Sequence, residues 1–184
     1  MENEKVSEKF LEKNILLIDG DINGAKFLYV KNAFANLYAR GSPDITIVIS
    51  SNGGDVLPGL DVFDILKLYP GKKTGLVLSG ARSMAAVILQ ACDVRKACDH
   101  ADIMIHHISR KEVTLDILRD SKRTDQMREE MEKSQAKLYD ILANKTKKSI
   151  EDIRKECEKE KFMNPKEAIA FGLLDEIWEG PLPK

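Results

Sequence analysis

The sequence predicts a single α/β domain over residues 1–184, built from repeated βαβ and ββα units around a mostly parallel sheet that helices surround. Short runs rich in Ile, Leu and Val alternate with longer segments whose apolar residues recur at helical spacing, which is typical of βαβ units. One run, residues 44–50 (DITIVIS), is apolar enough to be buried on both faces, as strands of a parallel sheet are. The length fits one domain with a substantial core, and no internal repeat or linker divides the chain.

Three strand–helix units account for the first half of the chain. Each begins with a short apolar run, expected to be a strand, and continues into a segment with helical periodicity. The expected strands span residues 14–20, 44–50 and 74–80. The first expected helix carries Phe27, Val30, Phe34 and Leu37 on one face and ends at Gly41. The second spans residues 56–69 and ends before Pro70, and the third begins at Ser83.

The second half of the chain is more charged. Further short strands are expected at residues 93–99 and 101–107. The domain ends with a short helix at 150–157, a helix from Pro165 and a closing strand at 173–178. Between about residues 113 and 145, a narrow apolar stripe predicts one long helix or two; its members are Met127, Met131, Leu138, Ile141 and Leu142. Such a stripe suits a solvated helix that covers the sheet, and it also suits packing against another subunit.

Composition excludes several classes of function. Lys and Arg number 29 against 30 Asp and Glu, so neither a nucleic-acid nor a membrane-surface partner is expected. The charged N-terminus lacks the apolar stretch of a secretory signal, and no apolar run approaches the roughly 18–20 residues of a membrane span. The three cysteines form no CxxC pair, which predicts reduced thiols in a cytoplasmic protein. We expect no cofactor and no metal.

Two junctions between an expected strand and the helix after it carry residues that suit an active site. In a parallel α/β sheet, sites form where strands end and helices begin. Gly53 and Gly54 follow the second strand, and Ser83 follows the third. A glycine pair is most often a turn, and a serine there is most often a helix cap. Together, however, they match an oxyanion hole in which the N–H groups of Gly53 and Met84 face one acyl oxygen.

A serine nucleophile needs a base, and the chain offers His100, His106 and His107. Alternation along a strand turns His106 and His107 to opposite faces, so only one of them can share a site with Ser83. A hydrogen-bonded structural role is the ordinary one for a lone histidine, and we expect it of His100 and His107. Periodicity by itself does not decide which face holds the site.

Four segments in order resemble the Clp protease proteolytic subunit (ClpP) family of self-compartmentalising serine peptidases. They are SNGGDV, SMAAVILQAC, ADIMIHH and KTKKSIEDIRKECEKEKFMNPKEAIAFGLLDEI. The C-terminal piece of the last, KFMNPKEAIAFGLLDEI, is the most specific. The resemblance covers about residues 9–177 and implies the ClpP/crotonase-like fold. It also implies a protruding handle-type helix at about residues 113–145 and leaves residues 1–8 as a short N-terminal segment.

Carried over residue by residue, the resemblance implies Ser83 as the nucleophile and His106 as the general base. It implies the backbone N–H groups of Gly53 and Met84 as the oxyanion donors. These assignments describe acyl transfer through an acyl-enzyme, with His106 taking the serine proton and returning it to the leaving amine.

The third member of the triad departs from the family. That member is an aspartate two residues before the phenylalanine of the C-terminal motif, and the matching position here is Glu160. Glutamate is one methylene longer, so the backbone or the imidazole must shift for its carboxylate to reach the histidine. Ser-His-Glu triads do work on other folds. Glu156 and Glu158 are nearby alternatives.

The resemblance also implies partners. Peptides or unfolded proteins would be the substrates, cleaved inside a chamber formed by a heptameric ring or a double ring. An AAA+ unfoldase is a possible partner, against which the short segment 1–8 argues. Two further departures are Arg82, where the family usually has alanine, and the stretch after His106, which lacks the family's Gly and Pro residues. The role of Arg82 stays open.

Two other classes of protein remain as alternatives. A non-catalytic or partner-activated ring subunit would account for the departures at Arg82 and Glu160, although such a scaffold has no need of both Ser83 and His106. An acyl-CoA enzyme of the crotonase type would share the fold and the paired-amide oxyanion hole. That enzyme would need a coenzyme A site, and no sequence feature requires one.

Overall fold

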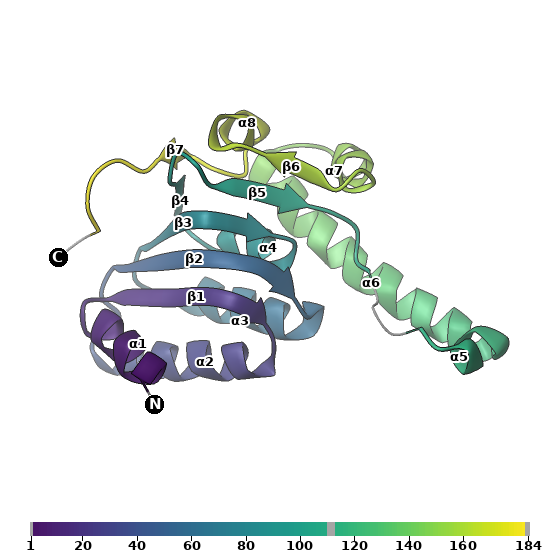
Figure 1. The fold of residues 1–184 in the computed structure, drawn as a ribbon, viewed down its shortest axis with the longest axis horizontal. Helices are drawn as coiled ribbons and strands as arrows, with labels where there is room; N and C mark the ends of the chain where they lie inside the picture. The colour runs from purple at the N-terminus through teal and green to yellow at the C-terminus, as the bar shows by residue number, and fades with distance from the viewer. Residues whose placement is uncertain (1, 110–112, 183–184) are drawn as a thin grey trace.

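A mostly parallel sheet organises the molecule (Figure 1). The computed structural model describes residues 2–109 and 113–182, and within them the strands form one seven-stranded sheet. Its main path runs β1 (Ile15–Ile22), β2 (Ile45–Gly54), β3 (Lys73–Arg82), β4 (Val94–Ala97) and β7 (Glu176–Ile177), all paired in parallel. Strand β5 (Asp102–Ile105) is parallel to β3, and β6 (Lys161–Met163) is antiparallel to β5. The α/β class and the mostly parallel sheet are confirmed.

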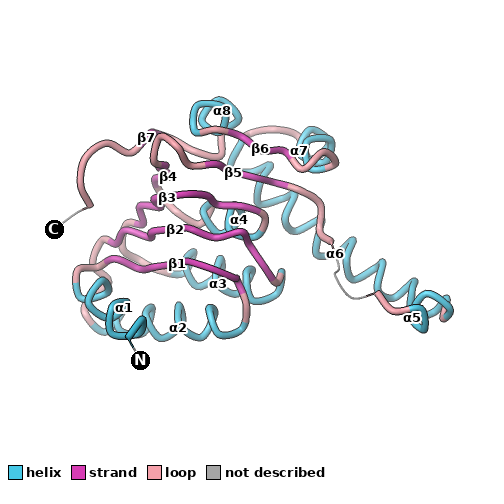
Figure 2. The backbone as a smooth tube through the Cα atoms, viewed as in Figure 1, coloured by secondary structure: helices cyan, strands magenta, loops and turns pink. Residues whose placement is uncertain are grey.

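Helices lie on both faces of the sheet (Figure 2). They are α1 (Glu2–Glu12), α2 (Gly24–Ala39), α3 (Val56–Leu68), α4 (Met84–Leu89), α5 (Leu115–Arg119), α6 (Ser121–Thr146), α7 (Ile150–Cys157) and α8 (Pro165–Phe171). The main core lies between the sheet and α2, α3 and α4. A smaller cluster on the other face joins strand residues Ile15, Val48 and Leu76 to Phe10 of α1 and to Trp178.

Burial explains why the central elements form as predicted. All five residues from 45 to 49 of β2 are buried, as the apolar run DITIVIS predicted. Every residue of α4 is buried as well, which accounts for its lack of an amphipathic pattern. Burying a single Leu or Ile side chain contributes about 1.5–3 kcal/mol, so these two elements carry much of the stability.

Strand β3 changes partner halfway along its length, and this change positions the site. Residues 74–77 pair with β4, whereas Gly80, Ala81 and Arg82 pair with Asp102, Ile103 and Met104 of β5. Strands β4 and β5 therefore follow one another along the same edge of β3. The chain leaves β5 beside the point where β3 ends, which brings residues 83 and 106 together.

The charged segment of the second half forms two helices, one of the outcomes that its periodicity allowed. Helix α6 buries Leu138, Leu142 and Thr146, all in its last third. Figure 2 shows α5 and the first half of α6 extending away from the sheet. In the part of the chain that the structure describes, no helix is both long and apolar enough to cross a membrane.

Two short features differ from the sequence expectation, and a third was not expected in detail: residues 2–8 belong to α1, which continues to Glu12. The three-residue strand β6 carries no recognisable strand pattern, since it forms only by pairing with β5. The closing strand shortens to Glu176–Ile177, because Leu173 and Leu174 before it pack into the core.

The cysteines differ in burial, which predicts their reactivity. Cys92 and Cys157 are buried, and burial raises the pKa of each thiol to about 12, whereas Cys98 is only half-buried. Because the thiolate is the reactive form, we expect a disulfide reagent at mildly alkaline pH to modify only Cys98 rapidly in the native protein. All three thiols should react after denaturation. Intact mass against time checks this, with Cys98→Ser as the control; fast modification of the native Cys98→Ser protein would contradict it.

Candidate active site

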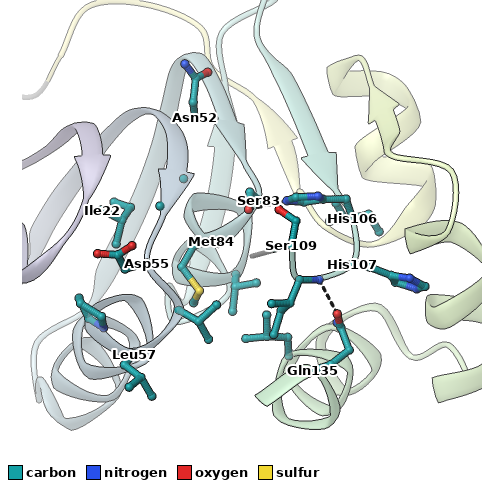
Figure 3. Close-up of a pocket in the computed structure, with 18 of the residues that line it drawn as sticks. Ile22, Asn52, Asp55, Leu57, Ser83, Met84, His106, His107, Ser109 and Gln135 are labelled. Atoms are coloured by element: carbon teal, nitrogen blue, oxygen red, sulfur yellow. Dashed lines mark hydrogen bonds between the residues drawn. The ribbon is translucent and has the colours of Figure 1, made fainter. Parts of the chain in front are cut away.

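A groove of about 930 Å³ opens where β2, β3 and β5 end (Figure 3). Its lining includes four of the five predicted site residues, which are Gly53, Ser83, Met84 and His106. Residues from three strands that are distant in sequence thus meet at the carboxyl edge of the sheet, where sites of parallel α/β proteins form.

Ser83 occupies a strained turn between β3 and α4. Its φ is 54° and its ψ −124°, a backbone conformation that costs a residue other than glycine about 1–3 kcal/mol. The Ser83 N–H donates to the Met104 carbonyl oxygen at 2.8 Å, which anchors the turn to β5. Ser83 stands at the N-cap position of α4, but its side chain makes no capping hydrogen bond. The helix-cap interpretation of its hydroxyl is therefore wrong.

The Ser83 hydroxyl instead faces an imidazole. Its Oγ lies 2.7 Å from His106 Nε2, which is hydrogen-bond distance. His107 is directed away from Ser83 (Figure 3), with its Nε2 3.2 Å from the Arg154 carbonyl oxygen and its ring edge-on to Tyr139. The two histidines are thus directed apart as predicted, although both follow β5 instead of lying within it. Both line the groove, and His106 is the one within hydrogen-bond distance of Ser83.

Of the three candidate acids, Glu160 is the one near His106. Its Oε1 lies 4.0 Å from His106 Nδ1, beyond hydrogen-bond length, and its side chain is 71% exposed. Glu156 pairs with Lys161 Nζ at 2.6 Å, and Glu158 lies toward Arg154. The register of β6 explains the placement, because Lys161 pairs with residue 105 and so sets Glu160 beside residue 106.

The backbone amide of Gly53 does not serve as the sequence predicted. Its N–H donates to Ser51 Oγ at 3.0 Å, and the Ser51 hydroxyl donates to the Gly20 carbonyl oxygen of β1 at 2.5 Å. The structure contradicts the expectation that the Gly53 N–H faces an acyl oxygen beside Met84, because that amide donates to Ser51 Oγ instead. The cause is a side-chain hydrogen bond that the Gly-Gly motif does not reveal.

Gly53 matters instead because it lacks a side chain. A Cβ atom at this position would lie 2.7 Å from Ser83 Cβ, 2.8 Å from the Arg82 carbonyl oxygen and 2.9 Å from the Met84 nitrogen. Its φ of 96° also favours glycine. The end of β2 can therefore approach Ser83 closely only because residue 53 is glycine.

The comparison with known families rests on nearly the whole chain: the family model for Clp protease matches residues 1–181. The chain belongs to the Clp protease family. It is accordingly a peptidase of the ClpP type and a hydrolase, and peptide substrates and assembly into rings accompany the family in general. The resemblance inferred from the four sequence segments is confirmed, and so is the α/β fold that it implied.

Three residues of the candidate site carried no usable signal in the sequence. Ser51 holds the Gly53 amide, as described above. Gln135 of α6 accepts a hydrogen bond from the Ile108 N–H at 2.5 Å and so ties the stretch after His106 to the long helix (Figure 3). Asp102 binds Arg82 with both carboxylate oxygens. Each contact joins residues at least 20 positions apart except that of Ser51, whose hydroxyl is two positions from Gly53.

The space around Gly53 predicts the effect of adding one methyl group there. We expect Gly53→Ala to lower peptide hydrolysis by about 100-fold or more, because the new Cβ would displace Ser83 and the Met84 amide. Gly41→Ala is the matched control, since Gly41 has a similar φ of 87° with nothing within 4 Å of its Cβ position. Both variants should lose about 1 kcal/mol of stability from backbone strain. Gly53→Ala should lose more because of the close contacts, and the control should keep its activity. Turnover of a fluorogenic peptide and thermal melting measure the two effects; an active Gly53→Ala protein would contradict the prediction.

Proposed function

We propose that the chain is a serine endopeptidase in which Ser83 is the nucleophile and His106 the general base. The observation that carries this proposal is the 2.7 Å separation of Ser83 Oγ and His106 Nε2 within a groove at the strand ends. A serine held in a strained conformation without a capping bond is what a nucleophile requires, because its hydroxyl stays free for the base.

The proposed reaction has two halves. His106 Nε2 takes the Ser83 proton as Oγ bonds to the carbonyl carbon of the peptide, and the carbonyl electrons move to the oxygen. The tetrahedral intermediate collapses, the C–N bond breaks, and the leaving amine receives the proton from His106. Water then repeats the sequence on the acyl-enzyme and releases the second product with Ser83 restored.

Two backbone N–H groups are proposed to hold the oxyanion: those of Met84 and Gly54. The Gly53 N–H donates to Ser51 Oγ, and the Asp55 N–H donates to the Ile22 carbonyl oxygen of β1 at 2.7 Å. The amide between them, that of Gly54, follows the glycine that lies against Ser83, and it is therefore the proposed second donor. Losing one such donor costs about 3–4 kcal/mol of transition-state stabilisation in comparable enzymes.

Glu160 is proposed to orient His106 through Nδ1. A carboxylate there favours the tautomer whose Nε2 is free to accept the serine proton, and it stabilises the imidazolium that forms. The 4.0 Å separation is long, and catalytic hydrogen bonds commonly tighten only when substrate is bound. Glu156 and Glu158 are weaker candidates, because each lies beside a cation of its own.

Cleavage inside an oligomeric chamber, by a heptameric ring or a double ring, is part of the same proposal. Family membership supports it, and so does the extended α5–α6 segment, whose Leu115 and Leu118 are exposed in the single chain. An apolar surface on an extended helix is a common contact between subunits. Peptides or unfolded proteins would be the substrates, and an AAA+ unfoldase stays a prediction.

Serine labelling tests the nucleophile. We expect a fluorophosphonate to add once per wild-type chain and not at all to Ser83→Ala, because only a serine activated by a base attacks phosphorus readily. Peptide hydrolysis by Ser83→Ala should fall at least about 1,000-fold. Intact-mass analysis and a fluorogenic peptide give the two readouts. A folded wild type without an adduct would instead favour the non-catalytic or partner-activated ring subunit.

Removing the charge of Glu160 tests the third member. We expect Glu160→Gln to lower kcat by about 10- to 1,000-fold with assembly intact, because His106 would lose the carboxylate that orients it. Glu158→Gln is the matched control, since Glu158 is also exposed to solvent on the same segment but lies toward Arg154. Peptide turnover and size-exclusion chromatography provide the measurements. A wild-type rate in Glu160→Gln would show that this acid does not orient His106.

A further inference from the structure

Arg82, the residue before Ser83, binds two partners at once. Its Nε and Nη2 donate to the two carboxylate oxygens of Asp102 at 2.7 and 2.6 Å, and its Nη1 donates to Asn52 Oδ1 at 2.5 Å. The planar guanidinium is suited to such a fork and offers fixed directions for each bond. These bonds engage the guanidinium within the protein, so it is not a free cation awaiting a substrate.

The three linked residues belong to the strands that lead into the groups of the proposed reaction. Asn52 precedes Gly53, whose bare Cα lies against Ser83. Arg82 precedes Ser83 itself. Asp102 begins β5, the strand that leads into His106. One guanidinium therefore connects the end of β2, the end of β3 and the start of β5.

The backbone leaves space for this arrangement. Gly80 pairs with Asp102 across the β3–β5 ladder, and Arg82 lies two residues further along β3 on the same face. A Cβ at Gly80 would lie 2.8 Å from Asp102 Oδ1 and 3.0 Å from Arg82 Cζ. The Arg82–Asp102 pair thus lies over Gly80, where an alanine would be excluded by these contacts and not by its φ. The bond to Asp102 also raises the pKa of Arg82, so the guanidinium stays charged.

We propose that Arg82 is a positioning residue which, through Asp102 and Asn52, holds Ser83, His106 and the end of β2 in their reactive arrangement. This inference rests on the serine peptidase function proposed above and deepens it. Ser83 has a costly backbone conformation, so its neighbours must hold it there. A displacement of about 1 Å among reacting groups can lower a rate by about 100-fold, which makes a rigid link at this point valuable.

The exposed fractions of two ion pairs separate a positioning role for Arg82 from a merely structural one. The side chains of Arg82 and Asp102 are 30% and 34% exposed, and ion pairs so accessible to water contribute little to stability. Arg95 and Asp175 form the same two-pronged pair on β4, away from the groove, and there the arginine side chain is only 9% exposed. Breaking the first pair should therefore affect the reaction more than the melting temperature, and breaking the second should do the reverse.

The experiment compares isosteric variants of the two pairs. For wild type, Arg82→Gln, Asp102→Asn, Asn52→Ala and Asp175→Asn, we would measure the rate constant of fluorophosphonate labelling, kcat and KM for a fluorogenic peptide, and the melting temperature. Arg82→Gln and Asp102→Asn should each lower the labelling rate and kcat by about 10- to 100-fold with little change in KM. Asn52→Ala should lower them less, because the Asp102 bonds remain. Asp175→Asn should melt earlier and label at the wild-type rate.

The decisive comparison is between the double variant of Arg82 and Asp102 and the two single variants. If Arg82 and Asp102 act as one unit, the double variant should be no slower than the slower single variant, because the second change removes nothing further. Gly80→Ala should also slow labelling, by displacing the pair without removing any charge. Wild-type labelling in Arg82→Gln, or multiplicative losses in the double variant, would overturn the inference and leave the proposed function standing. A wild type that takes no adduct, or an adduct that persists in Ser83→Ala, would overturn both.

Discussion

The pairing of β3 with β5 is the constraint on which the rest of the site depends. Because β3 pairs first with β4 and then, from Gly80 onward, with β5, the ends of β3 and β5 lie side by side. The Ser83 N–H bond to the Met104 carbonyl oxygen extends this ladder by one residue into the strained turn. Backbone hydrogen bonds thus set the distance between serine and imidazole, and rigid elements of this kind hold reacting groups more closely than loops do.

The candidate site residues differ in how firmly the surrounding structure holds them. Ser83 follows directly from a central strand, and the stretch after His106 is tied to α6 by Gln135. Glu160, by contrast, stands immediately before the three-residue strand β6; its side chain is 71% exposed, and its Oε1 lies 4.0 Å from His106 Nδ1. The least supported member is also the one that departs from the family's aspartate. Glutamate has a longer and more flexible side chain than aspartate, so its carboxylate can approach His106 although the backbone does not hold it there.

The close approach of β2 to β3 completes the arrangement. Gly53 permits the approach because it has no side chain, and Ser51 directs the Gly53 amide toward β1. The Arg82 guanidinium crosses the same gap through Asn52. Backbone, hydroxyl and guanidinium contacts thus act together where three strands end. A site built at such a junction can be altered by residues that never touch a substrate.

The sequence by itself determined the element types, the parallel sheet, the burial of β2, the opposite directions of His106 and His107, and the family, because each depends on local periodicity or on a contiguous motif. Only the tertiary structure decided that the Ser83 hydroxyl makes no capping hydrogen bond, that the Gly53 amide donates to Ser51, that Arg82 binds Asp102, and that Glu160, not Glu156 or Glu158, lies near His106. Strand β6 likewise exists only as a partner of β5. The physical reason is register: these contacts depend on which residues of distant strands lie opposite one another, and on side-chain hydrogen bonds that local periodicity does not encode.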